Sequence, residues 1–467
     1  MTAKFTAAQI CEACGGRLAA GRPEVAAAAI STDSRTLAPG QAFLALAGPS
    51  HDGHSYVPQA LQAGATVIVA ERWLEAWRLP PEAGLVLASS TARALMDLAA
   101  WHRRRLRGKV LAITGSCGKS TVKAMTAAIL SRAGRCTWAP KSFNNRIGVP
   151  LTLLKADVED DFVVLEMGTN HHGEIEELAR FARPHAGLIT CIGDCHLEGL
   201  GDRRGVMEAK GELIPHLKVG GLLALNADDP LCMELAARHA GPVRTFGFSP
   251  VADVRPVGLR WEGEAQAFEI ARRSFRLPAS GRHNVLNAAA AICLAGWAGA
   301  TSEQASEALA QIVLPGLRFE KRRIGGVEYV LDCYNSNPTA MRAALWTILD
   351  ESRGRRLVVV CGDMLELGQA GPSMHMHLGR VMALTGVDTL VAVGTLGRYV
   401  VRGWSEFAGE GRKAFHLPSV DEAWQVVQEN VGPGDIVLIK GSRAMRLETI
   451  PDAIVRQMTA DRQEAVA

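Results

Sequence analysis

The stretch Lys109-Val-Leu-Ala-Ile-Thr-Gly-Ser-Cys-Gly-Lys-Ser-Thr121 decides how the rest of the chain is interpreted. The aliphatic run at 110–113 is typical of a buried parallel strand. Gly115 and Gly118 permit a tight turn and a close approach of the backbone to a ligand. A helix predicted over 120–129 would point its N-terminal amides at an anion. The pattern indicates a phosphate-binding loop between a strand and a helix.

Lys119 and Ser120 supply the side chains that such a loop needs. A lysine at this position reaches phosphate oxygens, and the next hydroxyl reaches a magnesium ion. The spacing differs from the usual loop, which has four residues between its first glycine and its Gly-Lys pair, whereas here Gly115 lies three positions before Gly118. The alternative is a plain glycine turn that leaves Lys119 on the surface.

Composition limits the function classes. A chain of 467 residues is expected to hold about three domains. The net charge is only +3, and the basic cluster at 103–107 is short. It is typical of a solvated helix end, so no nucleic-acid partner is expected. Ten scattered cysteines favour reduced thiols. The isolated pair Cys11 and Cys14 lacks the further ligands of a zinc site.

The chain carries no pattern for membrane insertion or export. The first ten residues lack a signal-peptide layout. No run approaches the roughly 18 apolar residues of a membrane span. A soluble, cytoplasmic protein without a membrane span is therefore expected. We also expect a monomer, which these patterns do not bear on.

Alternating strand and helix patterns predict an α/β protein with three units, at 1–105, 106–314 and 315–467. The second and third units are predicted to be parallel sheets with crossover helices. The predicted strands lie at 42–46, 65–69, 84–88, 110–113, 162–166, 186–190, 221–226, 327–332, 356–361, 389–393 and 435–439.

Polar side chains follow several of these strands. Glu166 ends one strand, His196 follows another and Asp332 ends a third. Ligands of open α/β sheets bind at the carboxyl ends of strands, so we expect these groups near the phosphate loop. The alternatives are an exposed strand-end carboxylate for Glu166 and a structural histidine for His196. Lys210 lies in a helical pattern, where a lysine normally faces solvent.

Together these stretches resemble the Mur ligases, a family of ATP-dependent amide-forming enzymes of peptidoglycan synthesis. The family has the same shortened phosphate loop. The resemblance covers nearly the whole chain and rests on Thr114-Gly-Ser-Cys-Gly-Lys-Ser-Thr121, Asn144-Asn-Arg-Ile-Gly-Val-Pro150, Glu166-Met-Gly-Thr-Asn-His171, His196-Leu-Glu-Gly199, Ala209-Lys-Gly-Glu212, Gly281-Arg-His-Asn284, Asp332-Cys-Tyr-Asn-Ser-Asn-Pro338, Gly362-Asp-Met-Leu-Glu-Leu-Gly368 and Lys440-Gly-Ser-Arg443.

The resemblance implies a central P-loop ATPase domain, flanked by an N-terminal α/β domain for a uridine nucleotide and a C-terminal Rossmann-like domain. It is strongest to members that join D-alanyl-D-alanine to UDP-N-acetylmuramoyl-tripeptide through an acyl phosphate. The implied cofactors are ATP and two magnesium ions. The alternatives are the sister ligase that adds the third amino acid and, from another class, a nucleotide-dependent switch without ligation.

The resemblance also implies roles for individual residues. The implied catalytic residues are Lys119, Glu166, His196, Lys210 and Arg318. The implied ATP-binding residues are Gly115, Ser116, Cys117, Gly118, Lys119, Ser120, Thr121, Asn284, Asn287 and Asp332. The implied metal ligands are Ser120, Glu166, His196 and Lys210, the last of these as a carbamylated lysine. The implied substrate-binding residues are Thr32, Asp33, Ser34, Arg35, Gly48, His54, Asn145, Asn170 and His171.

One position departs from the family pattern. The family often has Pro-Gly-Arg at the start of the third domain, with its arginine at the γ-phosphate. This chain has Pro315-Gly-Leu-Arg318. Either Arg318, after a shift of one residue, or Arg322 is expected to take that role.

Overall fold

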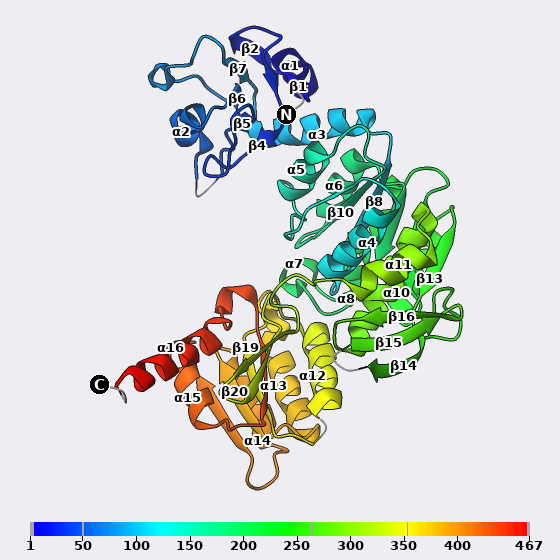
Figure 1. The fold of residues 1–467 in the computed structure, drawn as a ribbon, viewed down its shortest axis with the longest axis vertical. Coiled ribbons are helices and arrows are strands. Elements are labelled where there is room, and N and C mark those ends of the chain that lie inside the picture. The colour runs from blue at the N-terminus through cyan, green and yellow to red at the C-terminus, as the bar shows by residue number, and fades with distance from the viewer. Residues whose placement is uncertain (1–3, 49–50, 263–264, 353, 465–467) are drawn as a thin grey trace.

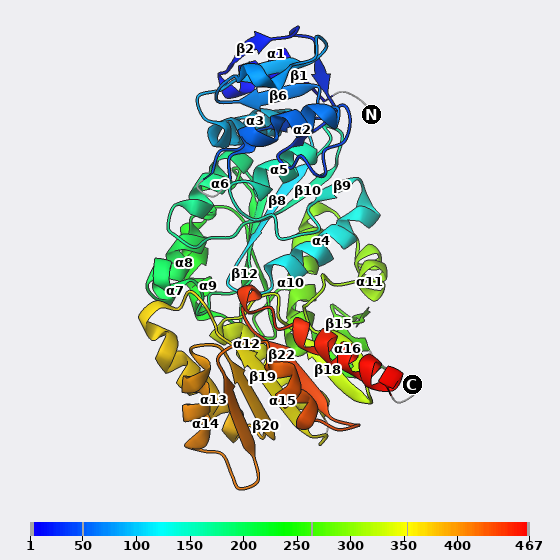
Figure 2. The same cartoon turned by 90° about the vertical axis from the view of Figure 1, so that its left-hand side faces the viewer.

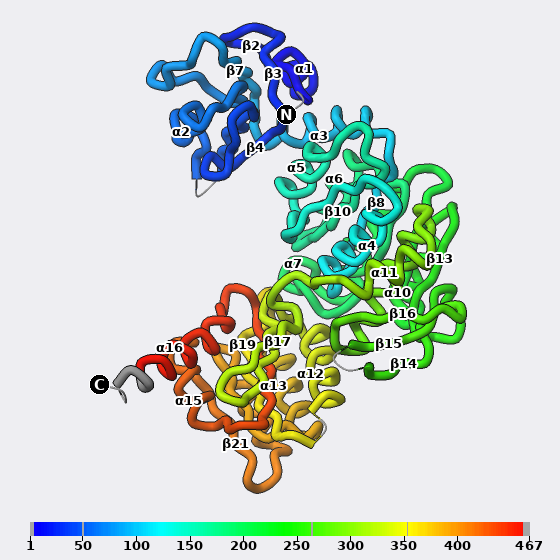
Figure 3. The backbone as a smooth tube through the Cα atoms, viewed as in Figure 1, coloured from blue at the N-terminus to red at the C-terminus, as the bar shows by residue number. Residues whose placement is uncertain are grey.

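Three α/β domains follow one another along the long axis of the molecule (Figures 1 and 2). The computed structural model describes residues 4–48, 51–262, 265–352 and 354–464, with side chains described as far as residue 460. Figure 3 follows the chain from the N-terminal domain through the central domain to the C-terminal domain. Within the described ranges, every helix is too short or too polar to cross a bilayer.

The N-terminal domain contains a five-stranded sheet in the order β2-β7-β6-β5-β4. Strands β4 to β7 run parallel and β2 pairs with β7 antiparallel. A small antiparallel pair, β1-β3, stands apart. The elements are β1 (Phe5–Thr6), α1 (Ala7–Cys14), β2 (Arg17–Ala20), β3 (Ala26–Ala27), β4 (Ile30–Ser31), β5 (Ala42–Leu44), α2 (Val57–Gln62), β6 (Val67–Ala70), β7 (Gly84–Leu87) and α3 (Thr91–Arg105).

The central domain contains an all-parallel, six-stranded sheet in the order β13-β12-β11-β8-β10-β9. Strand β8 lies between β10 and β11, so the strand order reverses at the phosphate loop. Such a reversal opens a crevice at the carboxyl ends of the strands. The elements are β8 (Lys109–Thr114), α4 (Lys119–Ala133), β9 (Cys136–Trp138), α5 (Gly148–Lys155), β10 (Phe162–Glu166), α6 (Glu174–Ala182), β11 (Ala186–Ile189), α7 (Leu197–Leu200), α8 (Arg203–Gly211), β12 (Leu222–Asn226), α9 (Pro230–Glu234), β13 (Val243–Phe246), β14 (Val257–Glu262), β15 (Ala265–Ile270), β16 (Arg273–Leu277), α10 (Arg282–Ala298) and α11 (Ser302–Ala310).

Alternate residues of β8 pack on opposite faces of this sheet. Leu111 and Ile113 belong to the apolar cluster formed with α4, α10 and α11. Val110 and Ala112 belong to the cluster formed with α5, α6 and α3. A strand that is covered on both faces needs a continuous apolar run, which explains the sequence of β8.

The antiparallel sheet β14-β15-β16 is a feature that the sequence analysis did not predict. It forms between β13 and α10, where only parallel strands and helices were expected. Phe268 and Phe275 stack across β15 and β16, with ring centroids 5.5 Å apart. Both rings join the apolar cluster beneath α10, so this small sheet supports the helix that carries Asn284 and Asn287.

The C-terminal domain contains a six-stranded sheet in the order β17-β18-β22-β19-β20-β21. All neighbouring strands are parallel except the edge strand β17, which pairs with β18 antiparallel. The elements are β17 (Glu320–Ile324), β18 (Val327–Leu331), α12 (Pro338–Ser352), β19 (Leu357–Gly362), α13 (Gly371–Leu384), β20 (Thr389–Val393), α14 (Gly397–Ser405), β21 (Lys413–Leu417), α15 (Ala423–Glu429), β22 (Ile436–Lys440) and α16 (Thr449–Glu464).

Leu438→Ala tests the packing of the C-terminal sheet. Leu438 lies on the central strand β22 and is fully buried. The substitution leaves a cavity, so we expect the free energy of unfolding to fall by about 2–5 kcal/mol, measured from the midpoint of urea unfolding. Val313→Ala is the control, because Val313 is 89% exposed and its truncation should change stability by less than about 0.5 kcal/mol. Equal midpoints for the two variants would contradict this packing.

Candidate active site

The phosphate loop joins β8 to α4 as the sequence predicts. Gly115 has φ of 140° and Gly118 has φ of 80°. A Cβ atom on Gly115 would lie 1.8 Å from Thr190 Oγ1, and one on Gly118 would lie 2.4 Å from Asn287 Oδ1. These two positions therefore require glycine both for their backbone conformation and for space.

Lys119 begins helix α4 and bends back over the loop. Its ammonium donates to the backbone carbonyl of Gly115 at 2.7 Å. The first amides of α4 face the same loop and have no helical acceptors of their own. A cation and free amides at a helix N-terminus together form an anion site.

A cavity of about 380 Å³ lies above the loop and is walled by two domains. It brings together all but one of the predicted ATP-binding residues, the exception being Gly115 at the base of the loop. The central domain contributes Ser116, Cys117, Gly118, Lys119, Ser120, Thr121, Ser142, Asn144, Glu166, Thr190, Cys191, His283, Asn284, Leu286 and Asn287. The C-terminal domain contributes Arg318, Asp332, Tyr334, Asn335, Asn337, Thr339, Ala340, Ala343, Ala344 and Lys440.

Glu166 ends β10 in the floor of this cavity, and its side chain is almost fully buried. Its Oε1 accepts hydrogen bonds from Ser120 Oγ at 3.1 Å and from Asn144 Nδ2 at 3.0 Å. Its Oε2 lies 3.0 Å from Lys123 Nζ, which is equally buried. Three elements, β10, α4 and the segment before α5, therefore meet at one carboxylate.

The charge of Glu166 is maintained by its surroundings. Burial alone would raise the pKa of this carboxyl group, because it penalises the charged form. The positive charges of Lys123 and Lys119, with hydrogen bonds from Lys123 and Ser120, outweigh burial and lower the pKa below its ordinary value. Glu166 is thus an ionised carboxylate beside the phosphate loop, and its oxygens can serve as metal ligands.

The oxygen ligands beside the phosphate loop, Ser120 Oγ and the Glu166 carboxylate, suit a magnesium ion that also binds phosphate oxygens. Magnesium usually takes one or two protein oxygens and completes its shell with phosphate and water. Ser120 Oγ and the Glu166 carboxylate are adjacent, and the other carboxylate oxygen, Oε2, is paired with Lys123. Across the described part of the chain, no three His, Cys, Asp or Glu side chains cluster as a metal site formed by protein alone.

Arg318, and not Arg322, reaches the phosphate loop. Arg318 Nη2 donates to Ser120 Oγ at 2.9 Å, and its guanidinium lies over the ring of Tyr334, 4.2 Å from the centroid. Arg322 instead pairs with Glu320 and Asp452. Of the two arginines, Arg318 alone lines the cavity, which favours it for the role that the shifted motif left open.

The C-terminal domain also touches the loop directly. Asn337 precedes α12, and its Oδ1 lies 3.4 Å from Cys117 Sγ. Its Nδ2 donates to the carbonyl of Ser116 at 3.5 Å. Asp332 pairs with Lys440 at 2.7 Å at the carboxyl ends of β18 and β22. The carboxyl ends of the two parallel sheets therefore face each other across the cavity.

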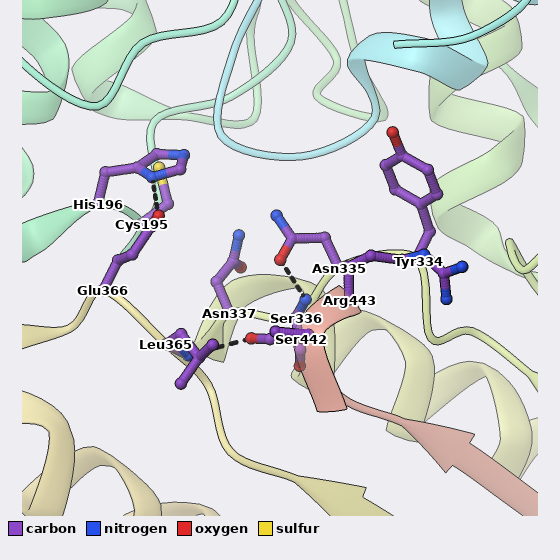
Figure 4. Close-up of a pocket in the computed structure, with 11 residues that line it drawn as sticks. Cys195, His196, Tyr334, Asn335, Ser336, Asn337, Leu365, Glu366, Ser442 and Arg443 are labelled. Atoms are coloured by element: carbon purple, nitrogen blue, oxygen red, sulfur yellow. Dashed lines mark hydrogen bonds and ion pairs between the residues drawn. The ribbon is translucent and has the colours of Figure 1, made fainter. Parts of the chain in front are cut away.

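His196 and Lys210 do not line the cavity above the phosphate loop, which we call the nucleotide cavity. His196 lines a neighbouring cavity of about 300 Å³ between the same two domains, with Glu366, Asn335, Asn337, Ser442 and Arg443 on its other walls (Figure 4).

Lys210 lies on α8 and is 1% exposed, which rejects the solvent-facing alternative. Burial lowers the pKa of its ammonium, and the charge of Lys119 adds to this effect. The described residues offer this ammonium no hydrogen bond or salt bridge.

The predicted substrate residues of the N-terminal domain lie outside both cavities. Arg35 is exposed and pairs with Asp33 at 2.8 Å, beside Thr32. Ser34 is buried and donates to Gln59 Oε1 at 2.9 Å. These contacts order the loop between β4 and β5.

The loop from Gly48 to His54 has a buried anchor. Pro49 and Ser50 of this predicted loop lie outside the described residues. His54 is fully buried, with Nδ1 2.5 Å from Asp52 Oδ1 and Nε2 accepting the Glu71 amide at 2.9 Å. Its observed contacts are those of a structural histidine.

Three further predicted residues lie between β9 and α6 in the central domain. Asn145 Oδ1 accepts from the amides of Ile147 and Gly148, which fixes the start of α5. Asn170 and His171 are exposed just after β10. Both side chains are therefore accessible to a ligand near the carboxyl end of β10.

Several residues at the site were not predicted from the sequence. Lys123 was missed because a lysine inside a helix normally faces solvent. Asn144 stands in a motif that was noticed, but its contact with Glu166 requires the fold. Glu366 is 170 positions from His196, and its contact with that residue has no local sequence signal.

The comparisons with known proteins agree with this three-domain fold. The model of the Mur ligase middle domain matches residues 113–295, that of the Mur ligase glutamate ligase domain matches 317–443, and that of the Mur ligase family catalytic domain matches 27–99. The UDP-N-acetylmuramoyl-tripeptide--D-alanyl-D-alanine ligase of Bacillus subtilis (strain 168) is 36% identical, over 90% of this chain and 92% of that protein.

Solved structures show the same three-domain arrangement. A crystal structure of MurF from Acinetobacter baumannii superposes with a TM-score of 0.87 at 30% identity, covering 98% of this chain and 100% of that one. MurF ligase from Thermotoga maritima in complex with ADP gives 0.78 at 26% identity, covering 91% of this chain and 96% of that one. The fold and loop define a P-loop protein with three α/β domains. The chain belongs to the Mur ligase family.

Lys119→Ala tests the phosphate loop. A hydrogen bond from a charged donor contributes about 1.5–3 kcal/mol, so we expect the affinity for a fluorescent ATP analogue to fall roughly 10- to 150-fold. Lys413→Ala is the matched control, because Lys413 is exposed on the edge strand β21. Near-equal affinity of the two variants would remove Lys119 from the site.

Proposed function

We propose that this protein is an ATP-dependent ligase that joins D-alanyl-D-alanine to UDP-N-acetylmuramoyl-tripeptide. The observation that carries the proposal is the similarity, over nearly the full length of both chains, to ligases of that name. The product would be the UDP-linked pentapeptide precursor of peptidoglycan, which connects the protein to cell-wall synthesis, cell shape and division.

The chemistry proceeds through an activated carboxylate. An oxygen of the terminal carboxylate of the tripeptide attacks the γ-phosphorus of ATP, and ADP leaves. The amine of D-alanyl-D-alanine then attacks the acyl carbon and loses a proton, and the tetrahedral intermediate expels phosphate. The protein contributes mainly by holding the reactants in line and by neutralising charge that develops on the phosphoryl group.

The residues of the nucleotide cavity divide this work. Lys119 and the loop amides would hold the β- and γ-phosphates, and Arg318 would add a second cation from the C-terminal domain. Ser120 and Glu166 would hold magnesium, which neutralises phosphate charge when bound. Asn284 and Asn287 on α10, with Asp332 after β18, would bind the adenosine part. The docked C-terminal domain excludes water that would hydrolyse an acyl phosphate.

Lys210 and His196 would serve the acyl side. A buried amine with a lowered pKa is readily neutral, and a neutral amine is nucleophilic towards carbon dioxide. Its nitrogen would bond to the carbon of carbon dioxide and lose a proton, which gives a carbamate anion. We propose that Lys210 carries this carbamate and that it and His196 are ligands of a second magnesium ion.

The N-terminal domain would hold the uridine nucleotide through the loops at 32–35 and 48–54, with Asn145, Asn170 and His171 facing the peptide part.

We divide the domains after residues 105 and 314. Helix α3 ends at Arg105, and the interval between α11 and β17 carries Arg318. A change of hinge angle within that interval would bring Arg318 to Ser120 or withdraw it.

The test of function is phosphate release coupled to product analysis. We expect ADP, phosphate and UDP-pentapeptide in equal amounts, only when UDP-tripeptide and D-alanyl-D-alanine are both present. A switch protein would release phosphate without them. The sister ligase would instead consume a UDP-dipeptide and a single amino acid, so either result would reject the proposal.

Lys210→Ala tests the carbamate. We expect turnover to fall by about 10²-fold or more, because a charge beside the reacting groups is lost. Independently, wild-type protein in carbon-13-labelled bicarbonate should show a carbamate carbon signal that Lys210→Ala lacks. Full activity of the variant, or identical carbon spectra, would show that Lys210 has no such role.

A further inference from the structure

A side-chain pair joins the central and C-terminal domains outside the nucleotide cavity. His196 Nδ1 lies 2.5 Å from Glu366 Oε2 (Figure 4). His196 precedes α7 in the central domain, and Glu366 lies in the loop after β19 in the C-terminal domain. The contact therefore exists only where the C-terminal domain is docked.

The backbone holds both partners in place. The amide of Glu198 donates to the carbonyl of Glu366 at 3.1 Å, beside the side-chain contact. His196 has φ of 52° and Glu366 has φ of 62°, although neither residue is glycine. A left-handed conformation costs about 1–3 kcal/mol at each non-glycine residue and persists only where the surrounding structure imposes it, as at functional sites. Both strained residues face each other across the same interface.

The contact determines which imidazole nitrogen is free. An ionised carboxylate can only accept a hydrogen bond, so Nδ1 of His196 must carry the proton. The lone pair of a neutral ring is then on Nε2. Histidines that bind metals or accept protons commonly have their other nitrogen fixed by a carboxylate in this way.

We propose that Glu366 is a positioning residue that sets the tautomer and ring orientation of His196 only when the C-terminal domain docks. The inference rests on the proposed function, in which His196 serves the acyl side; with Nδ1 held by Glu366, the nitrogen left for that role is Nε2. Domain docking then does two things at once: Arg318 reaches Ser120, and His196 acquires a free Nε2.

A purely stabilising ion pair is the alternative, and its exposure argues against it. The side chain of Glu366 is 50% exposed, and ion pairs at exposed sites contribute about 1 kcal/mol or less to stability. So small a gain would not offset two strained backbone conformations. An orientation constraint on His196 gives both strained residues a function.

The first experiment reads the tautomer directly. Protein with nitrogen-15-labelled histidine is studied with a non-hydrolysable ATP analogue, without divalent metal, well above the ordinary imidazole pKa of about 6.5. The His196 signals are identified by their loss in His196→Gln. We expect the proton on Nδ1 in the wild type and on Nε2 in Glu366→Ala. The same tautomer in both proteins would overturn the inference.

The second experiment separates positioning from binding. We expect Glu366→Ala to lower kcat about 10- to 100-fold with KM for UDP-tripeptide within twofold, and Glu366→Gln, which keeps an acceptor oxygen, to lose less. Glu198→Gln is the matched control, because this neighbouring side chain is exposed. Unchanged kcat in Glu366→Ala would overturn the inference. A wild type that makes no pentapeptide would instead reject the proposed function, while the tautomer would still be measured.

Discussion

The site depends on one buried carboxylate, that of Glu166. A charge in this position would be costly unless it were paired and hydrogen-bonded. Lys123 supplies the opposite charge, and Ser120 and Asn144 supply hydrogen bonds. Strand β10 is therefore tied to α4 and to the segment before α5, which fixes the floor of the cavity. Because Lys119 begins α4, the same network also sets the position of its ammonium beside the phosphate loop.

The second constraint is that the site is divided between domains. The central sheet presents Glu166 and the loop, and the C-terminal domain presents Arg318 and Glu366. The C-terminal domain reaches across with two polar groups: Arg318 contacts Ser120, and Glu366 contacts His196. An apolar cluster that includes members of both domains, among them Ile189 and Met341, lies beneath these contacts. This arrangement fits a reaction whose acyl phosphate must be kept from water until the amine arrives.

Most of the fold could be predicted from the sequence because its strands are continuous apolar runs. The strands Phe162–Glu166 and Thr389–Val393 have the predicted bounds. Strands that lack such runs were missed: β17 is a charged edge strand, and β14 alternates exposed with half-buried residues. Glu166 and Asp332 were predicted because they end strands. Lys123 and Glu366 were not, because the first resembles a surface lysine and the second acts across a domain boundary.

The central claim is that an oxygen of the tripeptide carboxylate becomes part of the released phosphate. The most direct measurement uses UDP-tripeptide whose terminal carboxylate is labelled with oxygen-18, with ATP and D-alanyl-D-alanine, followed by mass spectrometry of the phosphate. The account predicts that each phosphate carries one labelled oxygen for each amide formed. Unlabelled phosphate would show that ATP is cleaved by water, and would contradict an acyl-phosphate ligase at this site.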